Sequence, residues 1–264
     1  MVAFQPISLT FSQEEVVLLL KLFGAPTIPG LGEDPLAGLP KDQVQLILSS
    51  AERSLKARQI LSVATDGKIT IDRLVLALLG PCVTPEFSLI ANRIRRNNLP
   101  ETLYFHAAQA MKVEHAITGP GLHAFTALNG QEILLDRLGG FLNLDSQPAQ
   151  EDISGNISAN ILRDAIQAFE QGAPAMTAVL QGGGASTGLA NALGSNLETF
   201  VAISAVVAIR HLPEGKMNMQ RFAFLDCETA LWELGSTEDD QVFHLNSLSA
   251  EQAKGKIKEM ITDE

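Results

Sequence analysis

The chain has very few cysteines, and their placement excludes two kinds of site. Cys82 and Cys227 are the only cysteines among 264 residues, and no CxxC pair occurs. A zinc site needs closely spaced cysteines or histidines, and a small secreted scaffold needs several disulfides. The cysteine content therefore indicates a reducing compartment, in which both thiols stay free and have a structural role.

Aromatic residues and long apolar runs are also scarce. The sequence contains one tryptophan and one tyrosine, whereas hydrophobic residues of all kinds make up 46%. We therefore expect a mainly aliphatic core, which a chain of this length can bury. The longest apolar runs, 16–20 and 74–79, are far shorter than the roughly 20 residues of a membrane-spanning helix. Because no basic segment followed by an apolar stretch opens the chain, we expect no signal peptide, no membrane and a cytoplasmic location.

Positive charge is in deficit, which argues against a nucleic-acid partner. The 30 acidic residues outnumber the 19 basic ones, so the formal net charge is −11 and the isoelectric point is about 4.9. Proteins that bind nucleic acids need a basic face to displace counterions from phosphates. The one basic cluster, Arg93, Arg95 and Arg96, is interpreted as a solvated loop.

No catalytic, cofactor or metal site is predicted. A Gly-x-Ser-x-Gly elbow is absent, and the glycine-rich segment 182–188 has no lysine in Walker spacing and no preceding strand, so it is interpreted as a helix–helix connection. His106, His115 and His123 lie close in sequence. If 102–117 is one strand, however, His115 shares the apolar face and His106 points the opposite way, so the histidines do not converge on a metal.

Helical and strand patterns alternate in blocks along the chain. A capping box at Ser12–Glu15 begins a helix that ends at Gly24, and the loop 25–40, rich in proline and glycine, follows it. Period-two alternation predicts strands at 102–117 and 200–211. Further helices and strands are predicted over 41–61, 69–71, 72–79, 122–128, 132–138 (a strand or the start of a helix), 157–169, 173–180, 222–225, 229–234, 242–245 and a terminal helix capped by Ser249.

An internal repeat is suggested by placing His115 on His211. With this offset of 96, seven of the 25 positions from 115 to 139 are identical in the two segments, and the buried strand face is preserved. The sequence therefore predicts an α+β fold of two related halves, each made of helices followed by an antiparallel β-meander. The predicted domains are 1–144 and 157–264, joined by a polar linker at 145–156.

This order of elements resembles the EspG-type secretion-associated chaperones of bacterial type VII (ESX) secretion systems. The resemblance covers most of the chain and is clearest where Asp66-Gly67-Lys68-Ile69-Thr70-Ile71-Asp72 precedes an apolar helix that ends in Gly80-Pro81. It implies a quasi-two-fold α+β fold and a non-enzymatic cytoplasmic protein that covers the apolar tip of a helical secretion substrate. On that basis the expected contacts lie in the loops and hairpins 25–40, 118–121 and 182–188, with Gly119, Gly121, Leu122, Gly183 and Gly184 as partner-binding residues.

Two other classes of function stay open from the sequence. An exposed strand edge or apolar patch would favour a homodimer or another homo-oligomeric interaction protein. A pocket between the two halves, lined by convergent polar groups, would favour a small-ligand-binding or enzymatic module. The sequence alone does not reveal such a pocket, because its polar groups would converge only in the folded protein.

Overall fold

The computed structural model describes residues 6–96, 98–144, 152–237 and 241–262, and it has an α+β fold. The chain forms two compact units, each assembled from three separate segments. The first unit consists of Met1–Ile90, Thr102–Leu134 and Ile209–Asn218, and the second of Ala91–Glu101, Leu135–Ala208 and Met219–Glu264. No helix among the described residues is long and apolar enough to cross a membrane.

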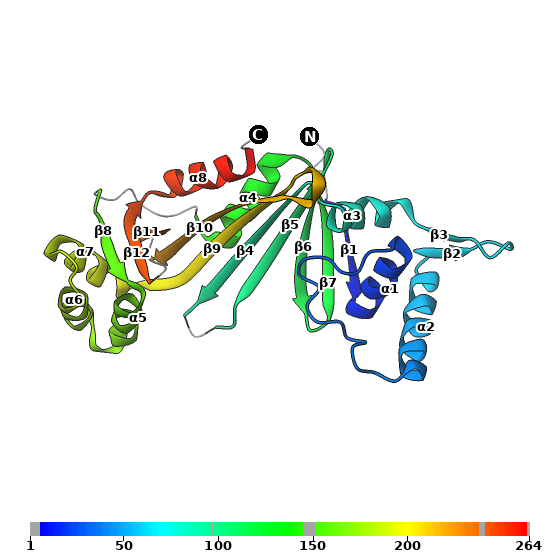
Figure 1. Ribbon diagram of the computed structural model, residues 1–264, viewed down its shortest axis with the longest axis horizontal. Coiled ribbons are helices and arrows are strands. Elements are labelled where there is room, and N and C mark those ends of the chain that lie inside the picture. The colour runs from blue at the N-terminus through cyan, green and yellow to red at the C-terminus, as the bar shows by residue number, and fades with distance from the viewer. Residues whose placement is uncertain (1–5, 97, 145–151, 238–240, 263–264) are drawn as a thin grey trace. The chain divides into compact units, whose positions relative to one another are not determined.

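The elements follow one another in an order that Figure 1 traces by colour. Up to residue 142 they are β1 (Ser8–Ser12), α1 (Gln13–Phe23), α2 (Lys41–Ala57), β2 (Leu61–Val63), β3 (Ile69–Ile71), α3 (Arg73–Val83), β4 (Phe87–Arg95), β5 (Glu101–Ala108), β6 (Met111–Gly119), β7 (Leu122–Leu128) and α4 (Gln131–Leu142). From residue 154 they are β8 (Ser154–Ser158), α5 (Ala159–Gln167), η1 (Ala168–Gln171), α6 (Ala173–Gly182), α7 (Thr187–Leu197), β9 (Phe200–His211), η2 (Pro213–Gly215), β10 (Met217–Cys227), β11 (Ala230–Ser236), β12 (Val242–Leu248) and α8 (Ala250–Thr262).

Local sequence signals set several helix ends as predicted. The Ser12 hydroxyl accepts from the Glu15 amide while the Glu15 carboxylate accepts from the Ser12 amide, and Gly24 ends α1 with a left-handed backbone. The Ser249–Gln252 pair makes the same reciprocal bonds at the start of α8. Helix α3 begins after Asp72 as expected, but it continues through Pro81 to Val83, so the predicted end at Gly80 was too early.

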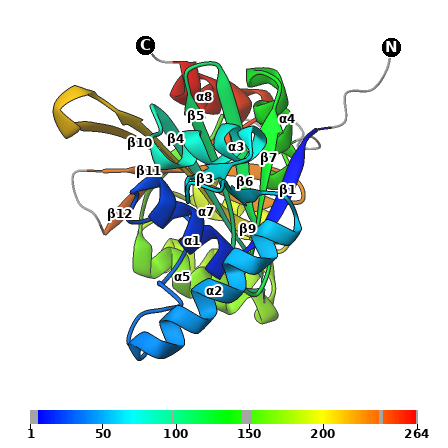
Figure 2. The same ribbon diagram turned by 90° about the vertical axis from the view of Figure 1, so that its right-hand side faces the viewer.

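In the first unit, α1, α2 and α3 pack on one apolar core together with β1, β6 and β7. Helix α1 lies beside α2 in both views (Figures 1 and 2). The long loop that follows α1 also packs into this core, because Ile28, Leu31 and Leu36 are buried. At Gly30, which has a φ of 86°, a β-carbon would collide with the ring of Tyr104, so only glycine allows this close approach.

In the second unit, α5, α6 and α7 pack against β8, β11 and β12. Trp232 of β11 is completely buried in this core, which also contains Leu180 of α6 and Leu193 of α7. Helices α6 and α7 approach closely because Gly194 faces Thr177, where a β-carbon would collide with the threonine side chain. The core is mainly aliphatic, which agrees with the scarcity of aromatic residues in the sequence.

Two predictions need correction, and one that was left open is decided. The alternating segment 102–117 is a hairpin of two strands, β5 and β6, which turns at Gln109 with a left-handed backbone (φ 53°). The segment around Arg93 is strand β4 instead of a solvated loop. Residues 132–138, for which the sequence left a strand or the start of a helix open, belong to helix α4.

The order of strands is the same in the two parts of the chain. The neighbours run β1-β7-β6-β5-β4 in one part and β8-β12-β11-β10-β9 in the other, and each series begins with the strand that leads into a helix capped by serine. Equivalent backbone bonds recur: the Gln13 amide donates to the Gly121 carbonyl at 2.8 Å, and the Ala159 amide donates to the Gln241 carbonyl at 2.7 Å.

The predicted repeat register of 96 is wrong. It places β6 on β9, whereas the strand order makes β6 equivalent to β11. Phe105 pairs with Glu114, and Phe224 pairs with Glu233, so the correct offset at both positions is 119 (224 − 105 and 233 − 114). The identities at an offset of 96 therefore join strands that are not equivalent in the fold.

The domain boundary predicted from the sequence stays a prediction. Within the proposed linker 145–156, residues 145–151 lie outside the described residues, while Ser154–Ser158 form strand β8. The predicted arrangement of helices followed by strands also missed β1 and β8, which open the two series. Both are short strands with one buried residue each, Phe11 and Ile157, so their alternation is too brief to detect.

Candidate functional site

The first unit carries a surface groove of about 550 Å³ between the β1–α1 junction, α2 and the start of β7. Its apolar lining comes from Phe11, Ile47, Ala51 and Leu122, and Leu122 is 42% exposed. Polar residues complete the lining: Thr10, Ser12, Glu14, Glu15, Ser50, Ser54 and Arg58. A mixed groove of this size fits part of a protein partner, with apolar contacts at its centre and polar groups at its edge.

A hydrogen-bonded network keeps one wall of this groove in place. The buried Glu15 carboxylate accepts from the Ser12 amide at 3.0 Å, from the Ser54 hydroxyl at 2.7 Å and from Arg58 Nη1 at 3.0 Å. Arg58 also donates from Nη2 to the Thr10 carbonyl at 2.8 Å. These bonds tie β1, α1 and α2 together, so the groove is largely formed before any partner binds.

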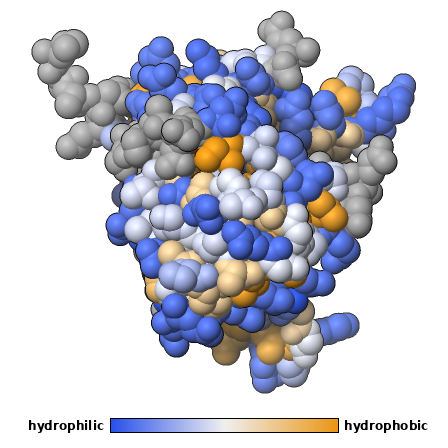
Figure 3. Space-filling model, turned by 90° about the vertical axis from the view of Figure 1, so that its left-hand side faces the viewer, coloured by the Kyte–Doolittle hydropathy of each residue, from blue (hydrophilic) through white to orange (hydrophobic). Residues whose placement is uncertain are grey.

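Further apolar side chains are exposed elsewhere on α2 and β6. Leu46, which precedes the groove residue Ile47 on α2, is 67% exposed. Ile117 of β6 is 50% exposed and is paired in register with His123, the neighbour of Leu122. On the face drawn in Figure 3, in contrast, hydrophobic residues form small patches separated by hydrophilic ones. Exposed apolar residues such as Leu122 in a preformed groove are typical of an interaction surface.

Three of the predicted partner-binding residues lie close together, and one of them lines this groove; their contact with a partner stays a prediction. Gly119 ends β6 and pairs with Leu122 across a bulge, and Gly121 makes the turn between the strands with a φ of 65°. Leu122 lines the groove. The α2 side of the groove, including Ile47 and Arg58, was missed, since helical spacing predicts α2 but not the neighbours of its exposed face.

The other two predicted residues, Gly183 and Gly184, lie in the second unit between α6 and α7. A β-carbon at Gly183 would collide with the side chain of Ile161 on α5, and Gly184 has a φ of 92°. The segment is a helix–helix connection, as predicted, with Ser186 capping α7. Both glycines are therefore explained by packing and by the turn, and their contact with a partner stays a prediction.

The histidines of β5, β6 and β7 come together in the first unit, which corrects the prediction that His106 and His115 diverge. His115 Nε2 lies 2.9 Å from His123 Nδ1, and the His106 and His115 rings are 6.3 Å apart. His115 stacks between Tyr104 and Phe125, with ring centres 5.4 and 4.5 Å away. The prediction assumed one continuous strand, in which odd and even positions face opposite sides. The hairpin turn at 109–110 interrupts this alternation.

These histidines are buried and neutral. Burial, together with smaller contributions from neighbouring histidines, lowers the pKa of His106 to about 4 and that of His115 to about 3. Burial also lowers the pKa of His123. Among the described residues, no three His, Cys, Asp or Glu side chains converge in a way that could hold a metal ion. The stack therefore serves as core packing at neutral pH.

The remaining reactive or charged candidates are also structural. Arg93 is buried in the second unit, where it pairs with the buried Asp226 and donates to the Phe141 carbonyl at 2.8 Å. Cys82 and Cys227 are both buried free thiols. Burial and the adjacent Asp226 raise the pKa of Cys227 to about 12, and burial raises the pKa of Cys82, so neither thiol has the character of a nucleophile.

Comparison with solved structures identifies a similar fold. The chain resembles the structure of the type VII secretion system chaperone EspG5 of Mycobacterium tuberculosis, which was determined in complex with a PE25-PPE41 dimer. The two folds superpose with a TM-score of 0.63 over 97% of this chain and 96% of the matched chain, at 12% sequence identity. The predicted EspG-like α+β fold is thereby confirmed, and the similar protein is a chaperone. No protein-family model and no curated protein matches the sequence.

Proposed function

We propose that this chain is a non-enzymatic cytoplasmic chaperone that binds one helical protein partner and covers the partner's apolar tip before secretion. The observation that carries the proposal is the likeness of fold over nearly the whole chain to a chaperone solved with its PE25-PPE41 partner. A binding role also agrees with the groove in the first unit, which combines exposed apolar residues with a preformed polar wall.

The groove provides a physical basis for such binding. An apolar tip placed on Leu122 and Ile47 removes nonpolar surface of both proteins from water, at roughly 25 cal/mol per Å². Because Glu15 and Arg58 are already bonded to each other, little side-chain freedom is lost when a partner binds. Glu14 at the groove edge and the net charge of −11 favour a partner with basic residues around its apolar tip.

The test is capture of the partner by the tagged protein from its native lysate, followed by mass spectrometry and by affinity measurements with the recovered partner. We expect one small helical secreted protein in stoichiometric amount. The variant Leu122→Asp places a charge on the apolar wall and should weaken the interaction at least about tenfold. Leu99→Asp is the matched control, since Leu99 is 85% exposed and lies in the other unit, away from the groove lining.

Three outcomes would contradict parts of the proposal. Recovery of the protein alone would argue against a chaperone. Recovery only of further copies of the same chain would favour the homo-oligomeric alternative. Equal affinities of Leu122→Asp and Leu99→Asp, with circular dichroism showing both variants folded, would exclude the groove as the contact.

A further inference from the structure

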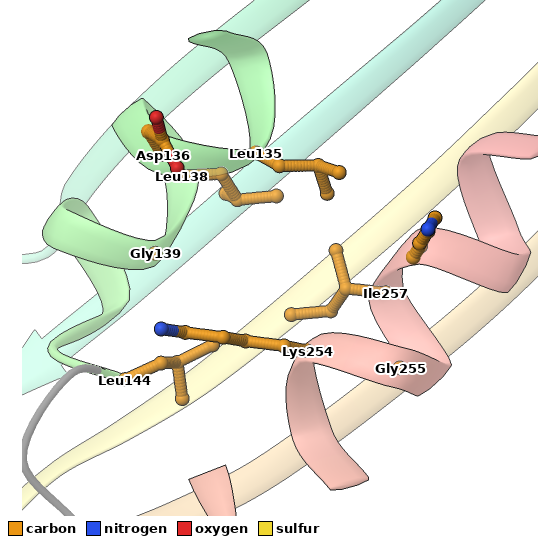
Figure 4. A pocket seen from close by; sticks show the side chains of 9 residues that line it. Leu135, Asp136, Leu138, Gly139, Leu144, Lys254, Gly255 and Ile257 are labelled. Carbon is orange, nitrogen blue, oxygen red and sulfur yellow. The ribbon is translucent and has the colours of Figure 1, made fainter. Parts of the chain in front are cut away.

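Two features of the second unit have no role in the proposed function. One is a cavity of about 310 Å³ between α4 and α8, into which the side chains of Leu135, Leu138 and Ile257 project (Figure 4). This mainly apolar lining does not specify a ligand. The other feature is the outer edge of strand β8, which stands last in the strand order and pairs only with β12 among the described strands (Figure 1).

The backbone bonds between β8 and β12 show which groups of β8 face outward. The Ala159 amide donates to the Gln241 carbonyl at 2.7 Å, so the odd-numbered residues of β8 are the ones bonded to β12. In an antiparallel pair, bonded residues alternate with residues whose N–H and C=O groups point away from the neighbouring strand. The outward backbone groups of β8 therefore belong to Ser154, Asn156 and Ser158.

The corresponding edge of the first unit, strand β1, is closed by side chains. The same alternation directs Thr10 and Ser12 outward. Arg58 Nη2 donates to the Thr10 carbonyl at 2.8 Å, and the Ser12 amide donates to the Glu15 carboxylate at 3.0 Å. In α5 the position of Glu15 is taken by Ile161, whose side chain accepts no hydrogen bond. Within the described part of the chain, no side chain is bonded to the outward backbone groups of β8, so this edge is open.

We infer that the outer edge of β8 pairs with the same edge of a second copy of this chain, antiparallel across a two-fold axis. Pairing centred on Asn156 places this residue opposite itself and Ser154 opposite Ser158. All outward amides and carbonyls of both strands then have partners. The inference does not depend on the proposed chaperone function, because β8 and the groove lie in different units.

The charges around β8 favour a second copy, although the chain as a whole is acidic. Residues 153–162 carry no charge, so the paired strands bring no like charges together. Beyond the strand, the exposed Asp152 of one copy approaches the start of α5 in the other, where the first turn has no acidic residue. Arg163 of α5 is bonded to Asn160 at 2.9 Å, is 3.8 Å from Asp164 and keeps 63% of its side chain exposed. A helix N-terminus and an arginine both favour a carboxylate, and the two-fold axis provides this contact twice.

Sedimentation velocity of the purified chain is the test of the inference. A strand pair of five residues on each side is a small interface, which is typical of weak and reversible association. We expect a monomer–dimer equilibrium with a Kd between about 10 µM and about 300 µM. A chain that stays monomeric at about 1 mM would overturn the inference, because at least half of it should then be dimeric.

Proline substitutions at the two sheet edges locate the contact. Asn156→Pro removes an outward amide at the two-fold axis, and proline is tolerated on an edge strand when its nitrogen faces outward, so the variant should fold and dimerise at least about tenfold more weakly. Ser8→Pro is the matched control, since Ser8 is an outward residue of the other edge strand, β1, and the Kd should change less than about threefold. If Asn156→Pro is folded by circular dichroism and dimerises as the natural protein does, the edge is not the contact.

A charge exchange tests the pairing at exposed positions, where folding is not affected. Asp152→Lys brings a second positive charge to Arg163 of the other copy and should weaken the dimer about threefold to tenfold. Adding Arg163→Glu to this variant reverses both charges and should return the Kd to within about threefold of the natural value. A double variant that dimerises no better than Asp152→Lys alone would contradict the pairing.

The same variants distinguish a second copy from a strand of another protein. If the natural chain is monomeric and Asn156→Pro instead loses a protein captured from the native lysate, the edge accepts a strand of that protein. This outcome would overturn the inference of a second copy. It would leave the groove of the first unit to be tested by Leu122→Asp as before.

Discussion

At the scale of single residues, the second unit contains a buried ion pair that the sequence did not indicate. Arg93 is 2% exposed and Asp226 is fully buried, and the two residues are 133 positions apart. Burial raises the pKa of Asp226, while Arg93 and the Asn143 amide counteract this shift by stabilising the carboxylate. When one partner of a buried ion pair is removed, the other charge stays buried without a counter-charge, and this destabilises the folded state.

We predict that Asp226→Asn lowers the free energy of unfolding by about 3–5 kcal/mol, because it leaves the Arg93 guanidinium buried without its counter-charge. Urea titration followed by circular dichroism measures the change. The matched control is Asp164→Asn, which removes the carboxylate of an exposed pair with Arg163 and should change stability by less than about 0.5 kcal/mol. Similar losses in the two variants would contradict the structural role of the buried pair.

The histidine stack should make the protein sensitive to acid. In the unfolded chain each histidine binds a proton below a pH of about 6.5, whereas the folded protein resists protonation of His115 down to about pH 3. Since the unfolded state binds more protons between these values, stability falls as the pH falls through this window.

We predict that His115 alone accounts for a loss of about 2–3 kcal/mol between pH 6.5 and pH 4.5. The variant His115→Phe keeps the stacking on Phe125 and removes the titrating group. Urea midpoints measured at several pH values should therefore decrease less steeply in the variant than in the natural protein. Because carboxylates titrate equally in both proteins, parallel pH profiles would show that His115 does not contribute.

At the scale of elements, helix ends follow local signals, whereas helix packing depends on distant residues. Ser12 and Ser158 both cap helices through their side chains, at the ends of strands β1 and β8. Gly194 and Gly188 are both in α7 and look alike in the sequence. Only Gly194 is buried against Thr177 of α6, while a β-carbon on the exposed Gly188 would meet no atom within 4 Å.

These two glycines provide a matched prediction. Gly194→Ala should lower stability by about 1–3 kcal/mol, since the added carbon forces α6 and α7 apart. Gly188→Ala should leave stability unchanged or raise it by up to about 1 kcal/mol through better helix propensity. Thermal melting of both variants checks the prediction, and a stabilised Gly194→Ala would contradict the close approach of the two helices.

At the scale of the whole molecule, each compact unit is built from three segments, and the segments of the two units alternate along the chain. Residues Ile209–Asn218 belong to the first unit, where the His211 amide donates to the Glu86 carbonyl at 2.9 Å. The segments Ala91–Glu101 and Leu135–Ala208 belong to the second unit, so Arg93 reaches Asp226 within it. Neither unit is a continuous piece of sequence.

We therefore predict that residues 157–264 alone do not fold, because they lack Arg93 and the buried Leu138 and Leu142 of α4. The near-ultraviolet circular dichroism of Trp232, the one tryptophan, should be lost in this fragment. Co-expression of 1–144 with 145–264 supplies every described segment and should restore the signal. A cooperative melt of the isolated fragment would instead support the contiguous domain boundary.

The sequence alone determined features that depend on neighbours along the chain. The capping box at Ser12, the left-handed stop at Gly24 and the alternation of β9 arise from local hydrogen bonding and side-chain period, and each was predicted correctly. The order of elements was sufficient to suggest the EspG-like fold without any signature motif, since a fold constrains the succession of helices and strands more than their identities.

Only the tertiary structure decided which distant residues meet. The hairpin at Gln109 brings His106 to His115, strand β4 buries Arg93, and α2 completes the groove at Leu122. The repeat register also followed from strand pairing, because Phe105–Glu114 and Phe224–Glu233 are equivalent only in space. Such contacts result from packing between segments far apart in the chain, and periodicity within one segment carries no information about the partner it will face.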